Sequence, residues 1–558
     1  MAAAKEQPCK TVNIAARHGK VDEMVSLIKT GKPVDVMDNR GWRPTHEAAN
    51  DNHVSCLKQL LEHDKTDINW RAFDLTTALL LACQMGHLET VRVLLEAEAD
   101  PNLPDCFQLT PLLAAVRSTK VDIVKQLLEA GANVDDKLYC GTTALHQAAA
   151  EGFIDIVNIL LEKGASVDSL EDYDITPVFT AAQHGQTECL KALLETAISR
   201  KQANIVNMGA EDGATPLYLA AQDGHYECVK LLLDYGADPN LTTDDPVSLP
   251  LLAAVNFERI RCVELLLKVT DMQRLWECEP YIYDLAMLSS SSDCLKTILE
   301  AGIPPDKCHA VQEDIYVHGI DNRVEFKREF PALVWCCWFK TSRKESLQML
   351  IDYGASVNAL APDYMAPLLA AACKTHLDSV KVLIRNGSTV NINHPIVEGN
   401  LALIACLHGW KCLSLLLLCN AKPDGLFVRS SSSDINPADG AKLDLFTVLT
   451  SSRPLISRRQ LTIGHVLYLL LNFANSVHID PRLQCFVEDE EQWSHIYNMT
   501  VAPRTLAHKS RLAIRTAMGS QRLCNVDFAH SLPLPSILRD YVMFMDLDRV
   551  LNVKQLLK

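Results

Sequence analysis

A chain of 558 residues with 48% hydrophobic and 22% charged residues has the composition of a folded, soluble protein with ample core material. Its formal net charge is −16, and no block of basic residues accompanies this charge, which argues against binding to phosphate backbones or anionic membranes. We therefore predict no nucleic-acid partner and no membrane partner.

The chain shows neither an export signal nor a disulfide framework. Residues Met1 to Cys9 lack an apolar signal core, and the most apolar runs, 413–418 and 466–471, are far shorter than the ~20 residues of a spanning helix. The 19 cysteines are an odd number, so we interpret them as reduced thiols of a cytoplasmic or nuclear protein. Cys406, His408 and Cys412 lie close together, but buried thiols are favoured there, and we expect no metal and no cofactor.

A repeated tetrad of the Thr-Pro-Leu type divides the first three quarters of the chain. Clear copies begin at Thr110, Thr143, Thr176 and Thr215. The first three follow one another at intervals of 33 residues, and a step of 39 residues before the fourth indicates an insertion. A 33-residue period with this tetrad is typical of ankyrin repeats. Weaker copies begin at Arg43, Thr77, Leu249 and Ala366.

One repeat, from Thr143 to Asp168, shows why the pattern predicts a pair of helices. A short alanine-rich helix follows Thr143 and ends at Gly152, which supplies the left-handed conformation of a C-cap. Phe153–Leu161 is predicted to be the second helix, because its apolar residues recur at helical spacing. The alanines allow close approach of neighbouring units, and each buried leucine contributes roughly 1.5–3 kcal/mol. No unit is stable alone, since each buries its faces on its neighbours.

His46 and His146 occupy the tetrad and resemble catalytic residues at first sight. The ankyrin pattern instead implies that this histidine braces the turn by hydrogen bonding. The pairs Gly86-His87 and Gly224-His225 are likewise predicted to be helix-end and turn residues.

The predicted array contains about eleven or twelve units between Thr11 and Asp424. Its first unit, Val12 to Asp38, is expected to be an N-terminal cap. The pattern is irregular after residue 271, and a long insertion is expected from about Pro304 to Glu329, so the register of 271–345 stays open. The predicted organisation is an array at 1–424, a linker with capping helices at 425–500 (443–450, 460–474 and 481–497), a box at 501–546 and a tail at 547–558.

The segment after the linker carries two motifs in sequence. Residues 505–515 predict a short amphipathic helix with Leu506, Ser510 and Ile514 on one stripe. Leu532-Pro533-Leu534-Pro535 follows, and then a predicted helix at 537–542. This order resembles the SOCS box: the first motif resembles its elongin-binding box and the second its cullin box.

Ser510 departs from the usual pattern, which has cysteine at this position of the elongin-binding box. Serine is nearly isosteric with cysteine but more polar, so we expect docking to be weaker by ~1 kcal/mol. Leu506 is expected to be the main anchor, because a buried aliphatic side chain is a common hot spot.

Taken together, the array and the box resemble the ankyrin repeat and SOCS box family. The fold class is then all-α: an ankyrin-repeat solenoid with β-hairpin loops, a helical linker and a three-helix SOCS box. The resemblance implies a non-catalytic substrate receptor of a cullin-RING ubiquitin ligase, which leads its target to ubiquitination and proteasomal degradation. Elongin B and elongin C would bind Leu506, Ser510 and Ile514. A cullin of the cullin five class, with its RING partner, would bind Leu532, Pro533, Leu534 and Pro535.

The residues that contact the unknown protein substrate are harder to predict. Large candidates at the repeat junctions are Trp42, Trp70, Arg71, Phe73, Phe107, Tyr139 and Tyr173. The alternative that about half of them pack on adjacent repeats is equally favoured. Asn102 and Asn240 follow Asp-Pro and are weak candidates for hydroxylation.

Two other functions compete with the ligase receptor. In the first, the chain is a plain ankyrin interaction scaffold whose final segment only caps the solenoid. In the second it is an enzyme, but the sequence contains no nucleophile–base motif and no phosphate-cradling glycine loop.

Overall fold

The computed structural model describes most of the repeat array and little beyond it. The described residues are 10–63, 66–244, 247–277, 282–288, 292–306, 309–313, 326–338, 344–361, 365–391, 393–394 and 399–400, with Cys412, Leu416, Leu417, Leu512 and Arg515. The chain forms two compact units, Met1–Pro280 and Tyr281–Lys558. Their boundary falls inside the expected array, close to residue 271, after which the repeat pattern becomes irregular.

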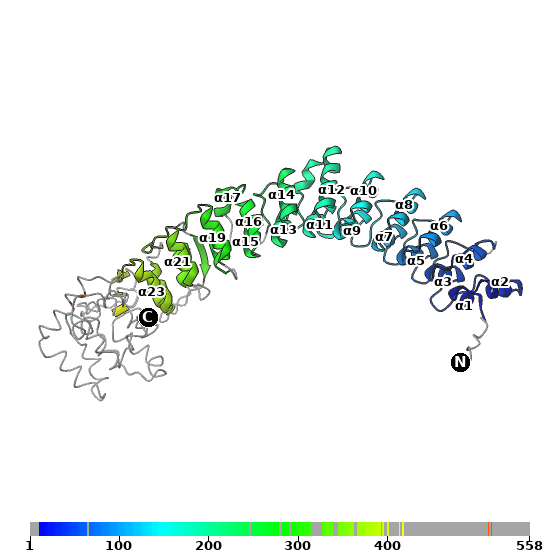
Figure 1. Ribbon diagram of the computed structural model, residues 1–558, viewed down its shortest axis with the longest axis horizontal. Helices are drawn as coiled ribbons and strands as arrows, with labels where there is room; N and C mark the ends of the chain where they lie inside the picture. The colour runs from blue at the N-terminus through cyan, green and yellow to red at the C-terminus, as the bar shows by residue number, and fades with distance from the viewer. Residues whose placement is uncertain are drawn as a thin grey trace, which may run out of the picture. The chain divides into compact units, whose positions relative to one another are not determined.

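The first unit consists of helix pairs stacked in chain order (Figure 1). The pairs are α1 (Val12–Arg17) with α2 (Val21–Lys29), α3 (Pro44–Asn50) with α4 (Val54–Leu61), α5 (Ala78–Met85) with α6 (Leu88–Glu96), α7 (Pro111–Arg117) with α8 (Val121–Glu129), α9 (Ala144–Glu151) with α10 (Ile154–Glu162), α11 (Pro177–Gln183) with α12 (Thr187–Ser199), α13 (Pro216–Asp223) with α14 (Tyr226–Asp234), and α15 (Pro250–Asn256) with α16 (Ile260–Leu266). Helix α17 (Met272–Glu277) follows. The first helices of the pairs form one row and the second helices form another, so each repeat packs on the next through both of its helices.

Local signals in the tetrad explain where the first helices begin and end. The Thr143 hydroxyl caps α9 by accepting from the His146 amide at 3.4 Å. The same bond recurs at Thr77, Thr110, Thr176 and Thr215. Gly152 ends α9 in the left-handed region at φ 78°. The predicted helix pair of this repeat is therefore confirmed.

The core lies between the two helix rows and between successive repeats. The alanines of the first row are fully buried, as at Ala148 and Ala149. Leucines and valines of the second row, such as Val157 and Leu160, fill the space behind them. Because alanine leaves room for the neighbouring helix, the small residues set the close spacing of the repeats.

The two tetrad histidines brace their turns as predicted. The Nε2–H of His46 donates to the Thr76 carbonyl at 3.1 Å, and that of His146 donates to Ile175 at 3.1 Å. In each case Nδ1 faces the amide at the start of its own helix, at 3.4 Å from Arg43 N and 3.3 Å from Thr143 N. Each histidine thus joins its own repeat to the following hairpin, which accounts for both side chains without any catalytic role.

A second series of side chains joins each repeat to the one before it. His87, at the N-cap of α6, donates from Nε2 to the Asn50 carbonyl at 2.9 Å. Equivalent bonds reach the preceding repeat from His53, Gln186, His225 and Arg259. Gly86 and Gly224 are the C-caps immediately before His87 and His225. The Gly-His pairs are therefore helix-end residues, as the sequence predicted.

The insertion predicted from the 39-residue step lies in the sixth repeat. Helix α12 has 13 residues, where α10 and α14 have 9, and a short 3-10 helix, η2 (Ala203–Asn207), follows it. Arg200, at the end of the lengthened helix, donates to the carbonyls of Ala165 and Leu161. The extra turn thereby packs back on the preceding repeat.

The second unit continues the helix pairs and adds two short hairpins. Its helices are α18 (Ile282–Leu288), α19 (Asp293–Glu300), α20 (Ala332–Trp338), α21 (Lys344–Asp352), α22 (Pro367–Cys373) and α23 (Leu377–Arg385). Strand β1 (His309–Glu313) pairs antiparallel with β2 (Phe326–Phe330), and β3 (Asn393–His394) pairs with β4 (Gly399–Asn400). The solenoid prediction is confirmed, while the strands inside the expected insertion were not foreseen. The predicted capping helices at 443–450, 460–474 and 481–497 lie outside the described residues.

Several cysteines of the described residues are buried and carry free thiols. Cys56, Cys189, Cys228 and Cys262 are buried and carry free thiols. Burial raises the pKa of Cys189 and of Cys262 to about 11, so both thiols stay protonated. Within the described residues, no helix combines the length and the hydropathy that a membrane crossing requires.

Candidate functional site

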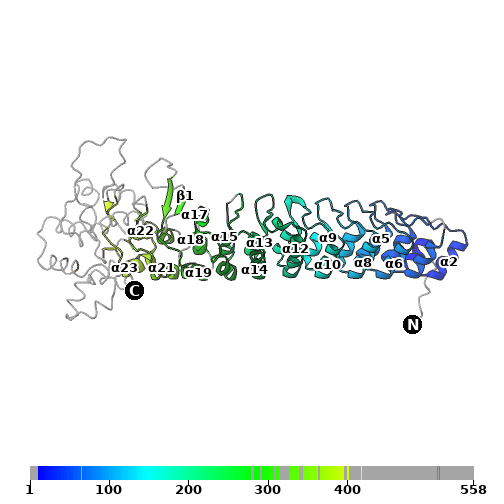
Figure 2. The ribbon, with the colours of Figure 1, turned by 90° about the horizontal axis from the view of Figure 1, so that it is seen from above.

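The hairpins between repeats end in five-residue tips that form one edge of the first unit (Figure 2). In the tip 72–76 the Ala72 amide donates to the Thr76 carbonyl at 2.9 Å, and the tips 105–109, 138–142, 171–175 and 210–214 are closed in the same way. A sixth hairpin is closed between Thr243 and Ser248. We call the exposed residues of these six hairpins the tip ridge.

Backbone hydrogen bonds connect four pairs of neighbouring tips along the ridge. The Cys106 amide donates to Asp74 O at 2.9 Å, and the Asp172 amide donates to Cys140 O at 2.8 Å. Further along, the amides of Glu211 and Asp244 donate to the carbonyls of the preceding tips, each at 2.9 Å. Each of these four tip pairs is therefore held side by side by one backbone hydrogen bond.

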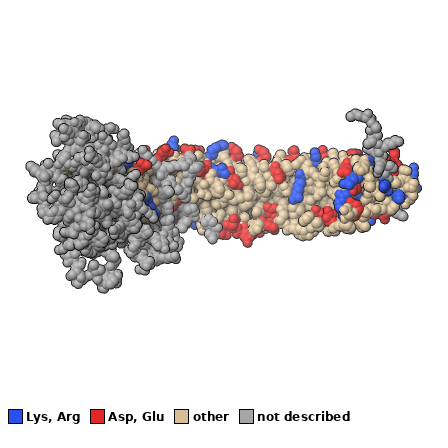
Figure 3. Space-filling view, turned by 90° about the horizontal axis from the view of Figure 1, so that it is seen from below, with Lys and Arg blue, Asp and Glu red and all other residues tan. Residues whose placement is uncertain are grey.

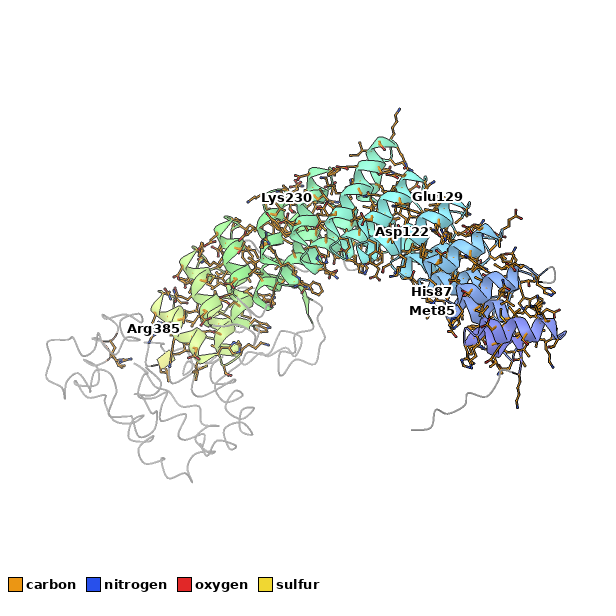
Figure 4. All side chains as sticks on the ribbon, turned by 45° about the vertical axis from the view of Figure 1, so that its right-hand side comes forward. Met85, His87, Asp122, Glu129, Lys230 and Arg385 are labelled. Carbon is orange, nitrogen blue, oxygen red and sulfur yellow. The ribbon has the colours of Figure 1, made fainter. Side chains whose placement is uncertain are left out.

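Four consecutive tips each carry an aromatic side chain that points to solvent. Phe73 and Phe107 are each 70% exposed, and Tyr139 and Tyr173 are each 71% exposed. The other large hydrophobic side chains of the described residues are at most 55% exposed. One of them is Met85, labelled in Figure 4, which is 54% exposed. An exposed row of aromatics is unusual in a folded chain and marks a surface for interaction.

The remaining three substrate candidates contact their own chain. The Arg40 guanidinium lies 3.7 Å from the ring centre of Trp42, and that of Arg43 lies 3.6 Å from the ring centre of Trp70. Trp70 also donates from its indole nitrogen to the Gly41 carbonyl at 3.0 Å. Arg71 donates to the Pro104 carbonyl of the next repeat. These half-buried residues brace adjacent hairpins, which is the alternative that the sequence left open for about half of the set.

Aspartates inside the tips hold the aromatic residues in place. Asp105 accepts from the amides of Phe107 at 2.8 Å and Leu109 at 2.9 Å. Asp74 accepts from the Thr76 amide at 3.1 Å in the neighbouring tip. Such turns fix the local backbone, so the tips of Phe73 and Phe107 are held by their own aspartates.

The ridge is acidic, which the sequence reading missed. The tip residues between 72 and 248 include no Lys and no Arg. Exposed carboxylates lie in four of these six hairpins, at Asp74, Asp172, Asp174, Glu211, Asp212 and Asp244. None of the ion pairs in the described part of the chain involves these six residues. In Figure 3 the lower edge of the middle of the array accordingly shows acidic side chains without basic ones.

The first hairpin differs, because its cation is neutralised within the chain. Arg40 contacts Asp38 at 2.8 Å and Glu47 at 2.5 Å, and Arg17 lies 3.6 Å from Glu47. Burial raises the pKa of Glu47, while Arg40 and Arg17 act in the opposite direction. The acidic ridge therefore begins at the tip 72–76.

The two asparagines named as hydroxylation candidates have structural partners. Asn102 Oδ1 accepts from the Asn133 amide at 2.8 Å, and Asn240 Oδ1 accepts from the Asp271 amide at 2.7 Å. Both side chains hold the start of the following repeat. Hydroxylation of either residue stays a prediction.

Most of the SOCS-box candidates lie outside the described residues. These are Leu506, Ser510 and Ile514 of the elongin motif and Leu532, Pro533, Leu534 and Pro535 of the cullin motif. Leu512 and Arg515 are described, and both are helical, as expected for the helix predicted over 505–515. Arg515 is 1% exposed and Leu512 is half-buried.

Models of known protein families match both the repeat array and the segment with the two SOCS-box motifs. A model of ankyrin repeats in three copies matches residues 12–105, 98–171 and 167–243. A SOCS box model matches residues 502–543, which contain both predicted motifs.

Similar curated proteins carry the same two names. Ankyrin repeat and SOCS box protein 3 of Homo sapiens is 47% identical over 105 residues, and that of Bos taurus is 44% identical over 105 residues. Each alignment covers 18% of this chain and 20% of the relative, so the match spans about a fifth of these proteins. Ankyrin repeat and SOCS box protein 14 of Homo sapiens is 28% identical over 323 residues, which are 56% of this chain and 52% of the relative.

Among solved structures, the ankyrin repeat domain of human ASB11 aligns at 29% identity with a TM-score of 0.36. It covers 40% of this chain and 98% of that domain. The order of the two family matches agrees with the order of the motifs: a repeat array first and a SOCS box after it. The chain therefore carries ankyrin repeats and a SOCS box, and it is similar to the ankyrin repeat and SOCS box proteins.

Proposed function

We propose that this protein is the substrate-recognition subunit of an elongin–cullin–RING ubiquitin ligase of the cytoplasm or nucleus. The observation that carries the proposal is the presence of a SOCS box at 502–543 after an array that exposes an aromatic ridge. A SOCS box recruits elongin B, elongin C and a cullin, here of the cullin five class with its RING partner. The ankyrin array binds the protein that becomes ubiquitinated and degraded.

In this role the chain catalyses no covalent step. It holds a lysine of the bound target near a charged ubiquitin carrier and so replaces a bimolecular encounter with an effectively intramolecular one. The increase in effective concentration depends on simultaneous binding of the target by the array and of the ligase subunits by the SOCS box. A chain that has lost either the array surface or the box is expected to support no ubiquitin transfer to the target.

Co-purification of the full chain with elongin B and elongin C tests the proposal. Leu506→Ala combined with Leu532→Ala and Pro533→Ala is expected to reduce elongin and cullin capture at least tenfold, because the main anchor and the cullin motif are lost. Phe73→Ala is the control, since it lies on the ridge and is expected to leave capture unchanged. If the wild-type chain captures neither elongin, the ligase proposal is wrong and the plain scaffold remains.

A single substitution at Ser510 is expected to strengthen elongin binding. Ser510→Cys restores the residue that the SOCS-box pattern has at this position and removes a hydroxyl that is expensive to desolvate. We expect an affinity about fivefold higher, which corresponds to ~1 kcal/mol. Titration of elongin B–elongin C into the two full-length chains measures the ratio. An unchanged affinity would show that Ser510 does not enter the elongin surface.

A further inference from the structure

We propose that the tip ridge binds an extended, lysine- and arginine-rich segment of a partner protein, with a cationic residue at about every third position. The interpretation that this segment is what the ligase recognises in its target rests on the proposed function. Binding of such a segment by the array can be tested without the SOCS box.

The aromatic side chains supply the first part of the argument. Phe73, Phe107, Tyr139 and Tyr173 are at least 70% exposed, so their ring faces are available to a ligand. The rings of Trp42, in the preceding hairpin, and of Trp70, in the same hairpin as Phe73, are instead covered by Arg40 and Arg43. Arginines of this chain therefore cover Trp42 and Trp70, whereas the four ridge aromatics stay exposed.

The carboxylates supply the second part, because they determine the sign of the occupant's charge. Asp74 and Asp172 lie beside the exposed rings, and Glu211, Asp212 and Asp244 extend the acidic surface beyond Tyr173. The tips hold no cation of their own. A cation on a partner would be attracted by both the ring faces and the carboxylates, whereas an acidic partner would be repelled by the carboxylates towards both ends of the ridge.

The geometry of the tips supplies the spacing. Bonds such as Cys106 N to Asp74 O place neighbouring tips side by side like strands, and strands are about 4.8 Å apart, so a two-stranded hairpin advances by ~10 Å. A peptide in the extended polyproline II conformation rises about 3.1 Å per residue with three residues per turn, so every third side chain lies on the same face at intervals of about 9 Å. One residue in three of a segment running along the ridge would therefore meet successive tips.

The binding experiment uses full-length protein and labelled synthetic peptides. The probe is a twelve-residue peptide of four Lys-Ala-Ser units, compared with an isomer that has its four lysines adjacent and with a peptide of four Glu-Ala-Ser units. Fluorescence anisotropy is expected to show the strongest binding for the spaced peptide, at least fivefold weaker binding for the isomer and none for the acidic peptide. Because surface charges are screened by salt, binding of the spaced peptide is expected to weaken as salt is added.

Alanine variants test the aromatic contribution. Combined replacement of Phe73, Phe107, Tyr139 and Tyr173 by alanine is expected to weaken binding of the spaced peptide at least 30-fold, while circular dichroism shows an unchanged fold. Phe257→Ala is the matched control. This phenylalanine is 45% exposed but follows the last turn of α15, at the end away from the tips, and its loss is expected to leave affinity unchanged.

A thiol footprint locates the peptide independently. Cys140 is exposed beside Tyr139 on the ridge, whereas Cys83 is buried in α5. The spaced peptide is expected to slow maleimide modification of Cys140, as followed by peptide mass spectrometry, and Cys83 is expected to stay unmodified in folded protein. Unprotected Cys140 at saturating peptide would place the binding elsewhere and overturn the proposal.

The failures of the two proposals are distinguishable. Equal binding of the spaced and clustered peptides, or full affinity in the aromatic variant, would reduce the interaction to unspecific charge attraction and overturn the inference. Elongin capture would be unaffected by either result. Conversely, a chain that binds the spaced peptide but captures no elongin would retain the inference and lose the ligase function.

Discussion

Replacement of Gly141 by alanine is expected to destabilise the hairpin that joins α8 to α9 by about 3 kcal/mol. Gly141 has φ +81°, and a Cβ atom there would lie 2.7 Å from Glu171 Cα and 3.0 Å from Leu170 O. The left-handed conformation costs a non-glycine residue roughly 1–2 kcal/mol. The overlap with the backbone of the next hairpin adds roughly 1–3 kcal/mol, because backbone atoms cannot move aside as a side chain can.

Gly131→Ala separates these two contributions. Gly131 has φ +88°, but nothing lies within 4 Å of its Cβ position, so only the conformational cost of about 1 kcal/mol remains. At roughly 2–4 °C per kcal/mol for a unit of this size, thermal unfolding is expected to shift down by roughly 6–12 °C in Gly141→Ala and 2–4 °C in Gly131→Ala. Equal shifts would show that contact between neighbouring hairpins contributes little to stability.

The helix pairs were predictable because their signals are local and repeated. Thr143 begins a helix and Gly152 ends it through bonds within a few residues, and the same signals recur with a fixed period. The pairing of β1 with β2 was not predictable in this way. It joins His309 to Phe330, and no periodic pattern links two segments that far apart in an insertion.

The candidate surface was predictable in outline but not in detail. Large residues at repeat junctions could be recognised from the sequence, yet Trp70 and Phe73 differ in exposure for reasons that lie outside the residue type. Trp70 is covered by Arg43 of the preceding repeat, whereas Phe73, at the second position of its tip, is 70% exposed. Which face of a repeat a side chain occupies depends on its position in the hairpin.

The acidic character of the ridge could be predicted from the sequence once the repeats were aligned by their period. Once the tips are aligned, the absence of Lys and Arg from all of them is visible without a structure. The net charge of −16 concealed it, because an average over the chain does not show where the charge lies. Alignment of repeats therefore predicts surface charge better than composition does.

Acidification from pH 7 to pH 4 is expected to destabilise the first unit through His46. Burial lowers the pKa of His46 from 6.5 to about 4, and its side chain is fully buried. The neutral ring donates from Nε2 to Thr76 O, while Nδ1 faces the Arg43 amide. A proton on Nδ1 would oppose that N–H group, so the folded chain resists the second proton.

The sign follows from the two pKa values. Between about pH 6.5 and pH 4 the unfolded chain has protonated His46 and the folded chain has not, so the free energy of unfolding falls as the pH falls. At about 1.4 kcal/mol per pH unit, the loss approaches ~3 kcal/mol at pH 4. Above pH 6.5 the contribution is fully present and constant.

His46→Gln isolates this contribution, because glutamine can donate to the Thr76 carbonyl but does not titrate. Urea unfolding of both proteins at intervals from pH 4 to pH 8 can be followed by tryptophan fluorescence, since the Trp42 ring lies 6.2 Å from the His46 ring. The stability difference between wild type and variant is expected to change between pH 6.5 and pH 4 and to stay constant above. Glu47 titrates in both proteins and so cancels from the difference. Parallel pH curves would mean that His46 takes up its proton as readily in the folded chain as in the unfolded one.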